Sequence, residues 1–430
     1  MPPIEDHPQR YATVNELHAR PFPSLTVPCT AVLLAIKQPG NAAGRDRALD
    51  RIHLLDLLAR EGSPQPAPEA THFFGTLGRA SMKWESHTEF VTYTAFSPGV
   101  SARPFDPAEV DVFPEDWLAQ APGKRLTSAV IRVEQMPEDE HEMVRQAEAW
   151  FVPESLAMAW VVDRTAVVAG DFRIDAAGQI RFAVFVRPGT SGRRVGRIVQ
   201  RLCEIETYRA VSMLGLLQAR SLTSSLNALD PKLSGLVLGL DHAEPSPEAA
   251  LHDLLGISAE LESLAVKYTF RFAGTAAYEA ILTQRIQALR EERIEGKQTF
   301  AEFMMRRYDP AMRTVRATER RLGAMAERAQ RAAELLRTRV DVERSARSQQ
   351  LLKSMDRRSD LQLRLQRTVE GLSVVAISYY AVSLLAYAAY PLGKLAGLSK
   401  EMLTALLVLP VILGVWLMVR RIRDHLHDDD

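Results

Sequence analysis

The chain has very few cysteines. Among its 430 residues only Cys29 and Cys203 occur, which are too few for a disulfide framework. They also lie far from any cluster of histidines, so they do not form the pattern of a zinc ribbon. Sparse cysteine is typical of a reducing compartment and argues against a small secreted scaffold.

The sequence also lacks an excess of charge of either sign. It has 53 basic and 53 acidic residues, so the total charge does not indicate nucleic acid as a partner. Charge is biased only locally: basic residues outnumber acidic ones from residue 306 to residue 370, and the chain ends in three aspartates. With 47% hydrophobic and 25% charged residues, the composition is that of a folded protein, and the length allows two or more domains.

Neither a secretory leader nor a reaction motif is found. Residues 1–24 form a polar arm without the basic start and apolar core of a signal peptide, so we expect the bulk of the protein to stay in the cytoplasm. The sequence predicts no catalytic set, no metal site and no cofactor, and therefore no enzyme. A membrane-tethered enzyme remains a third alternative, which a deep pocket containing His18, Arg20 or Arg193 would favour.

Long apolar runs occur only near the C-terminus. Residues 371–390 and 402–419 carry no charge, and a bilayer core of roughly 30 Å needs about 20 helical residues. We therefore predict a transmembrane hairpin of these two helices. An outer loop at 391–401 is expected between them, because Pro391 and Gly393 disfavour a continuing helix there.

Basic residues flank the two predicted spans unevenly. Between the spans only Lys394 and Lys400 occur, so the positive-inside rule places both termini in the cytoplasm and the loop outside. The flanks set the topology and attract anionic lipid, or they steer anions at a pore entrance. The membrane-proximal basic residues are Arg357, Arg358, Arg364, Arg367, Arg420, Arg421 and Arg423.

The first predicted span carries a stripe of hydroxyl groups. Hydroxyls are costly in hydrocarbon without a partner, so we expect this face to point into a helix bundle. Two interpretations stay open: the stripe packs against neighbouring helices, or it lines a pore between several copies. By their helical spacing, the residues of the stripe are Ser373, Tyr380, Ser383, Tyr387 and Tyr390.

Residues 25–220 have the pattern of an α+β domain. A long helix is predicted to begin after Thr190 or Ser191 and to end near Arg220. Arg193 and Arg194 at its start are a candidate anion site. The alternative interpretation is a simple capped helix start without a bound anion. Other helices are predicted at 45–60 and 137–149, and β-rich runs at 25–36, 88–96, 128–134, 156–163, 166–174 and 180–186.

A helical hairpin and long stalk are predicted at 247–370. Between Pro310 and Gly371 there is no further proline and only one glycine, Gly323, so the second helix should continue into the first span. A cytoplasmic tail is expected at 420–430. Apolar residues recur along the stalk as a seam of Leu322, Met325, Ala329, Ala332, Leu336 and Val340, followed by Leu351, Met355, Leu361, Leu365, Val369 and Leu372.

Several long stretches resemble one family of bacterial proteins. They include "NELHARPFPSL", "CEIETYRAVSMLGL", "GKQTFAEFMMRRYDPAMRTV" and the run that ends in "SYYAVSLLAYAAYPLG". That family is described as a domain of unknown function, predicted to be membrane-anchored. The resemblance implies a protein of the bacterial inner membrane and brings no reaction with it.

The order of the parts is similar to that of the CorA magnesium and cobalt transporters. That resemblance implies a pentamer whose first spans surround a pore for an inorganic ion. The outer loop of CorA transporters begins with glycine, methionine and asparagine, and the asparagine helps to select hydrated cations. In this sequence the corresponding start of the loop consists of Tyr390, Pro391, Leu392 and Gly393. The resemblance therefore does not extend to magnesium selectivity.

These observations combine into one expectation. The fold is an α+β cytoplasmic domain, a long helical stalk and a C-terminal two-helix transmembrane hairpin, in a CorA-like architecture. The expected function is ion transport or channel activity of unknown selectivity in a membrane-anchored homo-oligomer. Its partners would be the lipid bilayer, further copies of the chain and an inorganic ion, with no nucleic acid. The alternative is a membrane-tethered scaffold or regulatory protein without transport activity.

Overall fold

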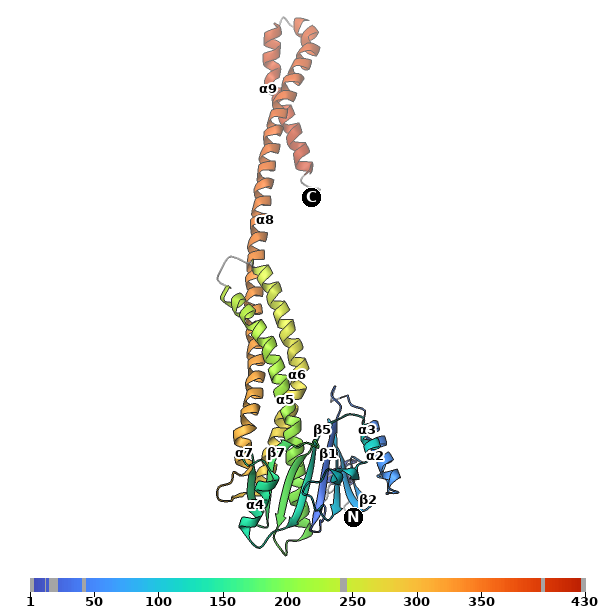
Figure 1. The fold of residues 1–430 in the computed structure, drawn as a ribbon. Helices are drawn as coiled ribbons and strands as arrows, with labels where there is room; N and C mark the ends of the chain where they lie inside the picture. Colours follow the sequence, from blue (N-terminus) through green and yellow to red (C-terminus); the bar gives the residue numbers. More distant parts are fainter. Residues whose placement is uncertain are drawn as a thin grey trace. The chain divides into compact units, whose positions relative to one another are not determined.

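The computed structural model describes residues 4–11, 13–14, 22–40, 44–239, 246–395 and 399–426. The chain divides into two compact units. Unit 1 comprises Met1–His242 and His252–Ala333, and unit 2 comprises Ala243–Leu251 and Glu334–Asp430. The α+β unit, the long helices and the apolar C-terminal helices expected from the sequence are all present (Figure 1).

Unit 1 is built on a mixed nine-stranded sheet with the order β2-β3-β4-β1-β5-β8-β7-β6-β9. Neighbouring strands are antiparallel except β5 and β8, which are parallel. The strands are β1 (Cys29–Lys37), β2 (His72–Leu77), β3 (Ala80–Ser86), β4 (Phe90–Pro98), β5 (Lys124–Gln135), β6 (Ala157–Val161), β7 (Ala166–Ile174), β8 (Ile180–Val186) and β9 (Glu292–Arg293).

One face of this sheet is covered by short helices. Every residue of β1 is buried, and a strand that is apolar on both faces needs a covering layer on each side. Helices α2 (Arg47–Arg60) and α3 (Glu115–Ala119) pack over β1 to β4 around Leu54 and Trp117. Helix α4 (Glu140–Trp150) packs over β5 to β8 through Met143. A 3-10 helix, η1 (Pro107–Val112), precedes α3.

The opposite face is covered by the first part of α5 (Gly192–Leu238). Side chains alternate along β4, so Tyr93 packs with the α2 cluster while Thr94 faces α5. Residues 22–25 lie against the start of α5, where the Leu25 amide donates to the Gly192 carbonyl at 3.1 Å. A Cβ at Gly196 would collide with the Pro23 carbonyl, so glycine is required for this close approach.

The sequence correctly predicted six strands and two of the shorter helices of unit 1. The strands are β1, β4, β5, β6, β7 and β8, and the helices are α2 and α4. Asp175 and Gly178 form the β7–β8 turn, in which the Asp175 carboxylate accepts from the Gln179 amide at 2.9 Å and Gly178 has a φ of +81°. Strand β3 escaped prediction because Lys83 and Glu85 interrupt its apolar pattern.

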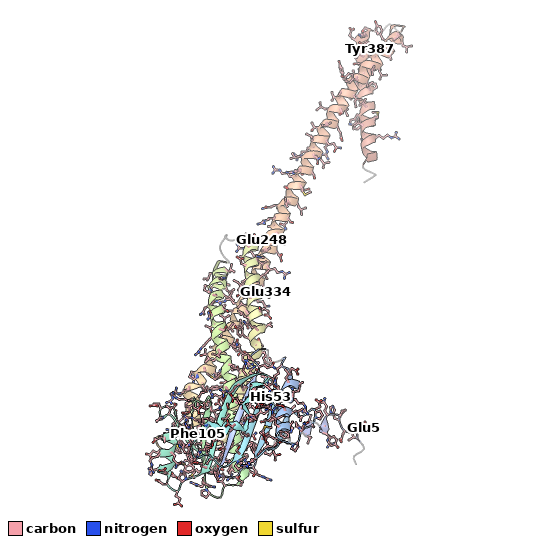
Figure 2. All side chains as sticks on the ribbon, turned by 45° about the vertical axis from the view of Figure 1, so that its right-hand side comes forward. Glu5, His53, Phe105, Glu248, Glu334 and Tyr387 are labelled. Atoms are coloured by element: carbon pink, nitrogen blue, oxygen red, sulfur yellow. The ribbon has the colours of Figure 1, made fainter. Side chains whose placement is uncertain are left out.

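Three long helices run side by side in unit 1 (Figures 1 and 2). They are α5, most of α6 (Pro247–Leu289) and the first part of α8 (Asp309–Leu395). Arg321 and Arg328 of α8 donate to Asp230 of α5 at 2.9 and 2.5 Å, and Arg316 of α8 donates to Glu279 of α6 at 2.5 Å. The short α7 (Phe300–Arg307), capped by Thr299 and Glu302, leads into α8.

Two predictions about these helices are corrected. The predicted end near Arg220 is wrong, because α5 continues through Pro231 to Leu238 and keeps a buried apolar face at Leu226 and Leu233. The predicted hairpin partner of the stalk, α6, is present, but α5 joins it as a third helix. The part of the first stalk seam that lies in unit 1, Leu322, Met325, Ala329 and Ala332, is therefore buried. Leu336 and Val340, which belong to unit 2, are buried as well.

Unit 2 contains the remainder of α8 and helix α9 (Lys400–Leu426). Among the described residues, two helical segments are long and apolar enough to cross a membrane: Asp309–Leu392 of α8 and Lys400–Arg421 of α9. Helix α9 turns back along the end of α8 (Figure 1), and Tyr387 lies close to this turn (Figure 2). The predicted loop at 391–401 is too long, because α8 continues through Pro391 to Leu395.

Candidate functional site

The predicted hydroxyl stripe lies on one face of the C-terminal part of α8. Tyr380 and Tyr387 are 67% and 72% exposed, and Tyr390 is 46% exposed. Ser373 is exposed and Ser383 is half-buried. The Ser383 hydroxyl donates to the Tyr379 carbonyl of its own helix at 2.9 Å. The tyrosine rings of the stripe are thus largely uncovered in the single chain.

A different face of α8 is buried where α9 runs alongside it. Ser378 and Val382 are only 5% and 9% exposed, and Ala381 and Ala386 next to them are half-buried. Small side chains of this kind let two membrane helices approach closely. At about 100° per residue, this face lies on the side of α8 opposite to the stripe. The half-buried face of α9 consists of Leu403, Thr404, Leu407, Val408, Val411, Val415 and Val419.

The part of α8 before the predicted span is exposed on all sides. Every side chain from residue 344 to residue 369 is exposed, although Leu351, Leu365 and Val369 are apolar and 65%, 68% and 56% exposed. Most of the stability of a helix in a protein comes from packing of an apolar face, and within the single chain this part of α8 has no such packing. The second stalk seam runs from Leu351 to Leu372. At 100° per residue, its residues and those of the hydroxyl stripe fall within one arc of about 120° on α8.

The predicted basic residues are spread over separate parts of the fold. Arg357, Arg358, Arg364, Arg367 and Arg421 are exposed, the Arg420 guanidinium lies 5.3 Å from the Trp416 ring centre, and the Arg423 side chain lies outside the described side chains. Arg193 and Arg194 lie in the first turn of α5, where the predicted cap residue Ser191 makes no side-chain hydrogen bond. Arg193 and Arg194 belong to unit 1, and the membrane-proximal arginines belong to unit 2.

The family model described as a protein of unknown function (DUF3422) matches residues 5–426. The chain belongs to this family. The match confirms the expected family and covers both units of the chain, but it supports neither the likeness to CorA transporters nor membrane anchoring. No curated protein matches the chain.

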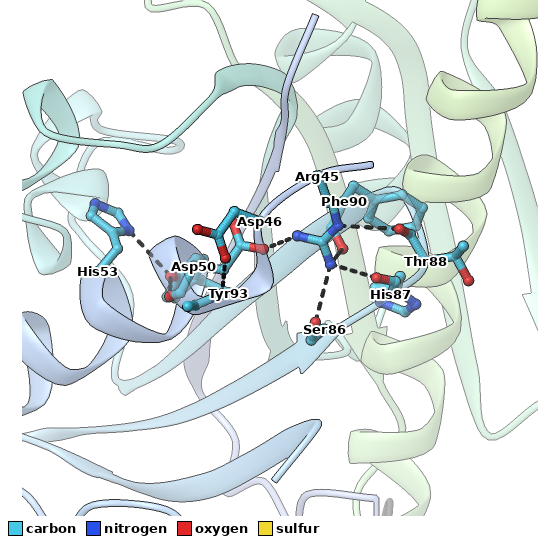
Figure 3. Close-up of polar contacts among 10 residues, drawn as sticks. Arg45, Asp46, Asp50, His53, Ser86, His87, Thr88, Phe90 and Tyr93 are labelled. Carbon is cyan, nitrogen blue, oxygen red and sulfur yellow. Dashed lines mark hydrogen bonds and ion pairs between the residues drawn. The ribbon is translucent and has the colours of Figure 1, made fainter. Parts of the chain in front are cut away.

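A buried polar network in this DUF3422 protein joins α2 to strands β3 and β4 (Figure 3). Arg45 forms an ion pair with Asp50, and both side chains are almost fully buried. The same guanidinium donates to the carbonyls of Thr88 at 3.1 Å and His87 at 2.5 Å and to the Ser86 hydroxyl at 3.1 Å. Because these donors are occupied by the backbone of the β3–β4 connection, the network fastens α2 to the sheet.

His53 extends this network on α2. Its Nε2 lies 3.0 Å from the Trp117 carbonyl and its Nδ1 lies 3.2 Å from the Tyr93 hydroxyl. The ring stacks on Trp117 with 3.8 Å between centres. Burial lowers the pKa of His53, and the hydrogen bond to the Trp117 carbonyl opposes this in part. A neutral ring that donates from Nε2 and accepts at Nδ1 satisfies both contacts.

A small polar cavity of about 190 Å³ lies between the sheet and helices α5 and α6. Lys83 Nζ is 3.1 Å from Glu85 Oε2, and Arg285 pairs with Glu204 across the two helices. The buried Gln200 Oε1 has no hydrogen-bond partner. Charges of both signs therefore balance in this cavity. This cavity was not predictable from the sequence, because its lining residues come from β1, β3, β4, α5 and α6, which are far apart in the chain.

The lining of the cavity can be compared with the pocket expected for a membrane-tethered enzyme. Cys203 lines it, but burial raises the pKa of this thiol to about 12, whereas a nucleophilic cysteine needs a lowered pKa. Arg193 does not line it, and His18 and Arg20 lie outside the described residues. Among the residues that the structure describes, no group of three or more His, Cys, Asp or Glu side chains could hold a metal ion.

Proposed function

We propose that this protein is a membrane-anchored homo-oligomer in which the first spans surround a path for inorganic ions. The α8–α9 hairpin would be the anchor in a bacterial inner membrane, with both termini in the cytoplasm because the basic residues flank the hairpin on that side. Further copies of the chain and the lipid bilayer are its proposed partners, and nucleic acid is not one.

The observation that carries this proposal is the direction of the hydroxyl stripe. The buried face of α8 contains Ser378 and Val382, so the stripe with Tyr380 and Tyr387 points away from α9. In a bilayer these hydroxyls would face acyl chains unless another helix or water covers them. Several copies that turn the stripes toward one axis would satisfy them.

The exposed stalk supports the same assembly. Leu351, Leu365 and Val369 share the arc of the stripe, so packing these apolar residues between copies would also bring the stripes together. Five copies would follow from a CorA-like arrangement. The stripe carries hydroxyls and no carboxylates, so selectivity would depend on pore width and on the arginines near the pore entrance.

Subunit number and ion flux test the proposal together. The full chain is purified in detergent, its mass is measured by light scattering, and flux of monovalent and divalent cations and of chloride is followed in liposomes. We expect at least four copies and a flux that changes when Ser383 is replaced by leucine. A monomer or dimer would overturn the ion path.

Cysteine cross-linking tests the direction of the stripe directly. A cysteine at Ser383 should form disulfides between copies in membranes. The matched control is Leu385→Cys, because Leu385 is also exposed but lies about 160° away from Ser383 around the same helix. Equal cross-linking at both positions would contradict a stripe that faces a common axis.

One observation favours the alternative, a membrane-tethered scaffold or regulatory protein. The loop predicted at 391–401 lacks the asparagine of CorA transporters, and its one carboxylate, Glu401, follows Lys400 at the start of α9, so it offers no recognisable selectivity filter. In that case, replacing the whole hairpin with an unrelated one should preserve the cellular phenotype. A phenotype that is lost on this exchange, in a chain that still reaches the membrane, supports the ion path instead.

A further inference from the structure

Unit 1 has a second and larger hollow, which differs in character from the polar cavity. This groove has a volume of about 800 Å³, within the range of roughly 300–1,000 Å³ that is usual for small-molecule sites. Its walls are the end of β1 with the residues that follow it, the start of β5, and facing positions on α5 and α6. Helices α5 and α6 run side by side there (Figure 1).

The groove is strongly positive in a chain with no net charge. Its fourteen described lining residues include five cationic side chains and no carboxylate. A single acidic group, Glu89, lies behind the wall at 2% exposure and pairs with Arg271 and, at 3.8 Å, with Lys37. One carboxylate therefore serves two cations. The cationic side chains of the groove are Lys37, Lys124, Arg125, Lys267 and Arg271.

Three of these cations have no acidic partner among the residues that the structure describes. Lys124 and Arg125 are exposed at the start of β5, and Lys267 is exposed on α6, where its Nζ lies 5.3 Å from the Tyr268 ring centre. The pKa of Lys37 is lowered, first by burial and then by the nearby Arg271 guanidinium. The groove therefore holds more positive than negative charge among the residues that the structure describes.

An apolar wall faces these cations. Leu217 of α5 and Val266 of α6 are 60% and 73% exposed, and Phe270 of α6 is 43% exposed. Exposed apolar side chains that occur singly need no explanation, but here they line one groove beside a set of cations. A ligand that matches both parts has several negative charges and a flat apolar ring system.

We propose that this groove binds a nucleoside di- or triphosphate. The phosphates would contact Arg125, Lys124 and Lys267, because Arg and Lys are the side chains best suited to phosphate oxygens. The base would stack on Phe270, since nucleobases gain free energy by stacking on aromatic rings. This assignment is independent of the proposed ion path.

Competition binding with the full chain in detergent tests the ligand class. A fluorescent ATP analogue is the probe, and ATP, ADP, tripolyphosphate and adenosine are the competitors. We expect ATP and ADP to displace the probe, and tripolyphosphate and adenosine each to compete at least ~10-fold more weakly, since each keeps only one half of the contacts. Tripolyphosphate that competes as well as ATP would reduce the groove to a nonspecific basic patch and overturn the proposal.

Substitutions locate the site. Arg125→Gln combined with Lys267→Gln should weaken ATP binding by ~10-fold or more, because each substitution removes a charge-assisted contact. Phe270→Ala should weaken ATP but leave tripolyphosphate unchanged. The control is Arg313→Gln, an exposed arginine on α8 outside the groove, which should bind as the unaltered chain does. Matching melting temperatures verify folding, and an equal loss in the control would contradict the assignment.

Discussion

At the scale of single residues, burial fixes the protonation state of several groups in unit 1. His53 is 6% exposed and lies between the Trp117 carbonyl and the Tyr93 hydroxyl. The charged groups near it, Asp56 and Arg60, have opposite effects on its pKa. Burial is the larger influence and lowers the pKa below the ordinary value of 6.5, so the folded chain holds the ring neutral.

The protonation of His53 predicts a loss of stability in mild acid. As the pH falls through 6.5, the unfolded chain binds a proton at this position before the folded chain does, so the free energy of unfolding decreases. The decrease continues until the pH reaches the lowered pKa of the folded state. In His53→Phe the pH dependence between 7 and 5 should be shallower, as measured by thermal unfolding in detergent.

The same substitution has a cost that does not depend on pH. It leaves the buried Trp117 carbonyl and Tyr93 hydroxyl without His53, which should lower stability at pH 7 by about 1–3 kcal/mol. Identical pH slopes in the two proteins would show that His53 does not titrate as its surroundings imply.

Both cysteines should be unreactive in the folded protein. Cys29 and Cys203 are 3% and 6% exposed, and burial raises each pKa to about 12. Since the thiolate is the reactive form, alkylation by iodoacetamide at pH 8 should be at least ~100-fold slower than in urea. Mass spectrometry of the intact chain measures this. Fast labelling of the folded chain would show that one thiol is accessible.

At the scale of elements, one glycine sets the distance between α5 and α6. A Cβ at Gly215 would overlap the Thr275 side chain of α6, and Thr275 is 2% exposed. Nearby, the Tyr308 hydroxyl donates to the buried Ser212 at 2.8 Å. The helices therefore meet at a packed junction that has no room for a larger residue.

A pair of glycine substitutions tests this junction. Gly215→Ala should destabilise unit 1 by about 1–3 kcal/mol, because an added methyl group must displace a buried side chain. The control is Gly235→Ala in the same helix, where nothing lies within 4 Å of the new Cβ. Alanine is the better helix former, so this change should stabilise by up to about 1 kcal/mol. Chemical unfolding followed by circular dichroism measures both.

The exposed seam of α8 allows an equally matched comparison. Leu365→Asp places a charge on the seam that we propose to be covered by other copies, and it should reduce the subunit number in detergent. Leu363→Asp is the control, because Leu363 is also exposed but lies about 160° away around the helix. Loss of assembly with both variants, or with neither, would contradict a specific seam.

At the scale of the whole molecule, membrane topology is the most direct prediction. If both termini are cytoplasmic, a cysteine at Leu392, in the last turn of α8, should react with an impermeant maleimide in intact cells. A cysteine at Ser348, in the exposed stalk, should react only after lysis. The unreactive native cysteines provide a low background. Labelling of Ser348→Cys in intact cells would reverse the proposed orientation.

Local patterns determined much of this protein. Strands β1, β4, β5, β6, β7 and β8 were predictable because β-rich apolar runs are bounded by turn residues, as at Asp175 and Gly178. The apolar C-terminal helices were predictable because length and lack of charge suffice to identify them. Helix ends were less predictable. Proline disfavours a helix interior, yet α5 continues past Pro231, where Leu233 is buried, and α8 continues for one more turn past Pro391.

The sequence by itself determined the α+β character, the long helices, the apolar hairpin and the residues of the stripe, since each depends on neighbours within a few turns. Only the tertiary structure decided that the first seam of α8 is buried and that the second remains exposed. It alone showed that the stripe turns away from α9, and that cations from β1, β5 and α6 gather in one groove. These facts depend on contacts between residues far apart in the chain, which helical or strand periodicity does not encode.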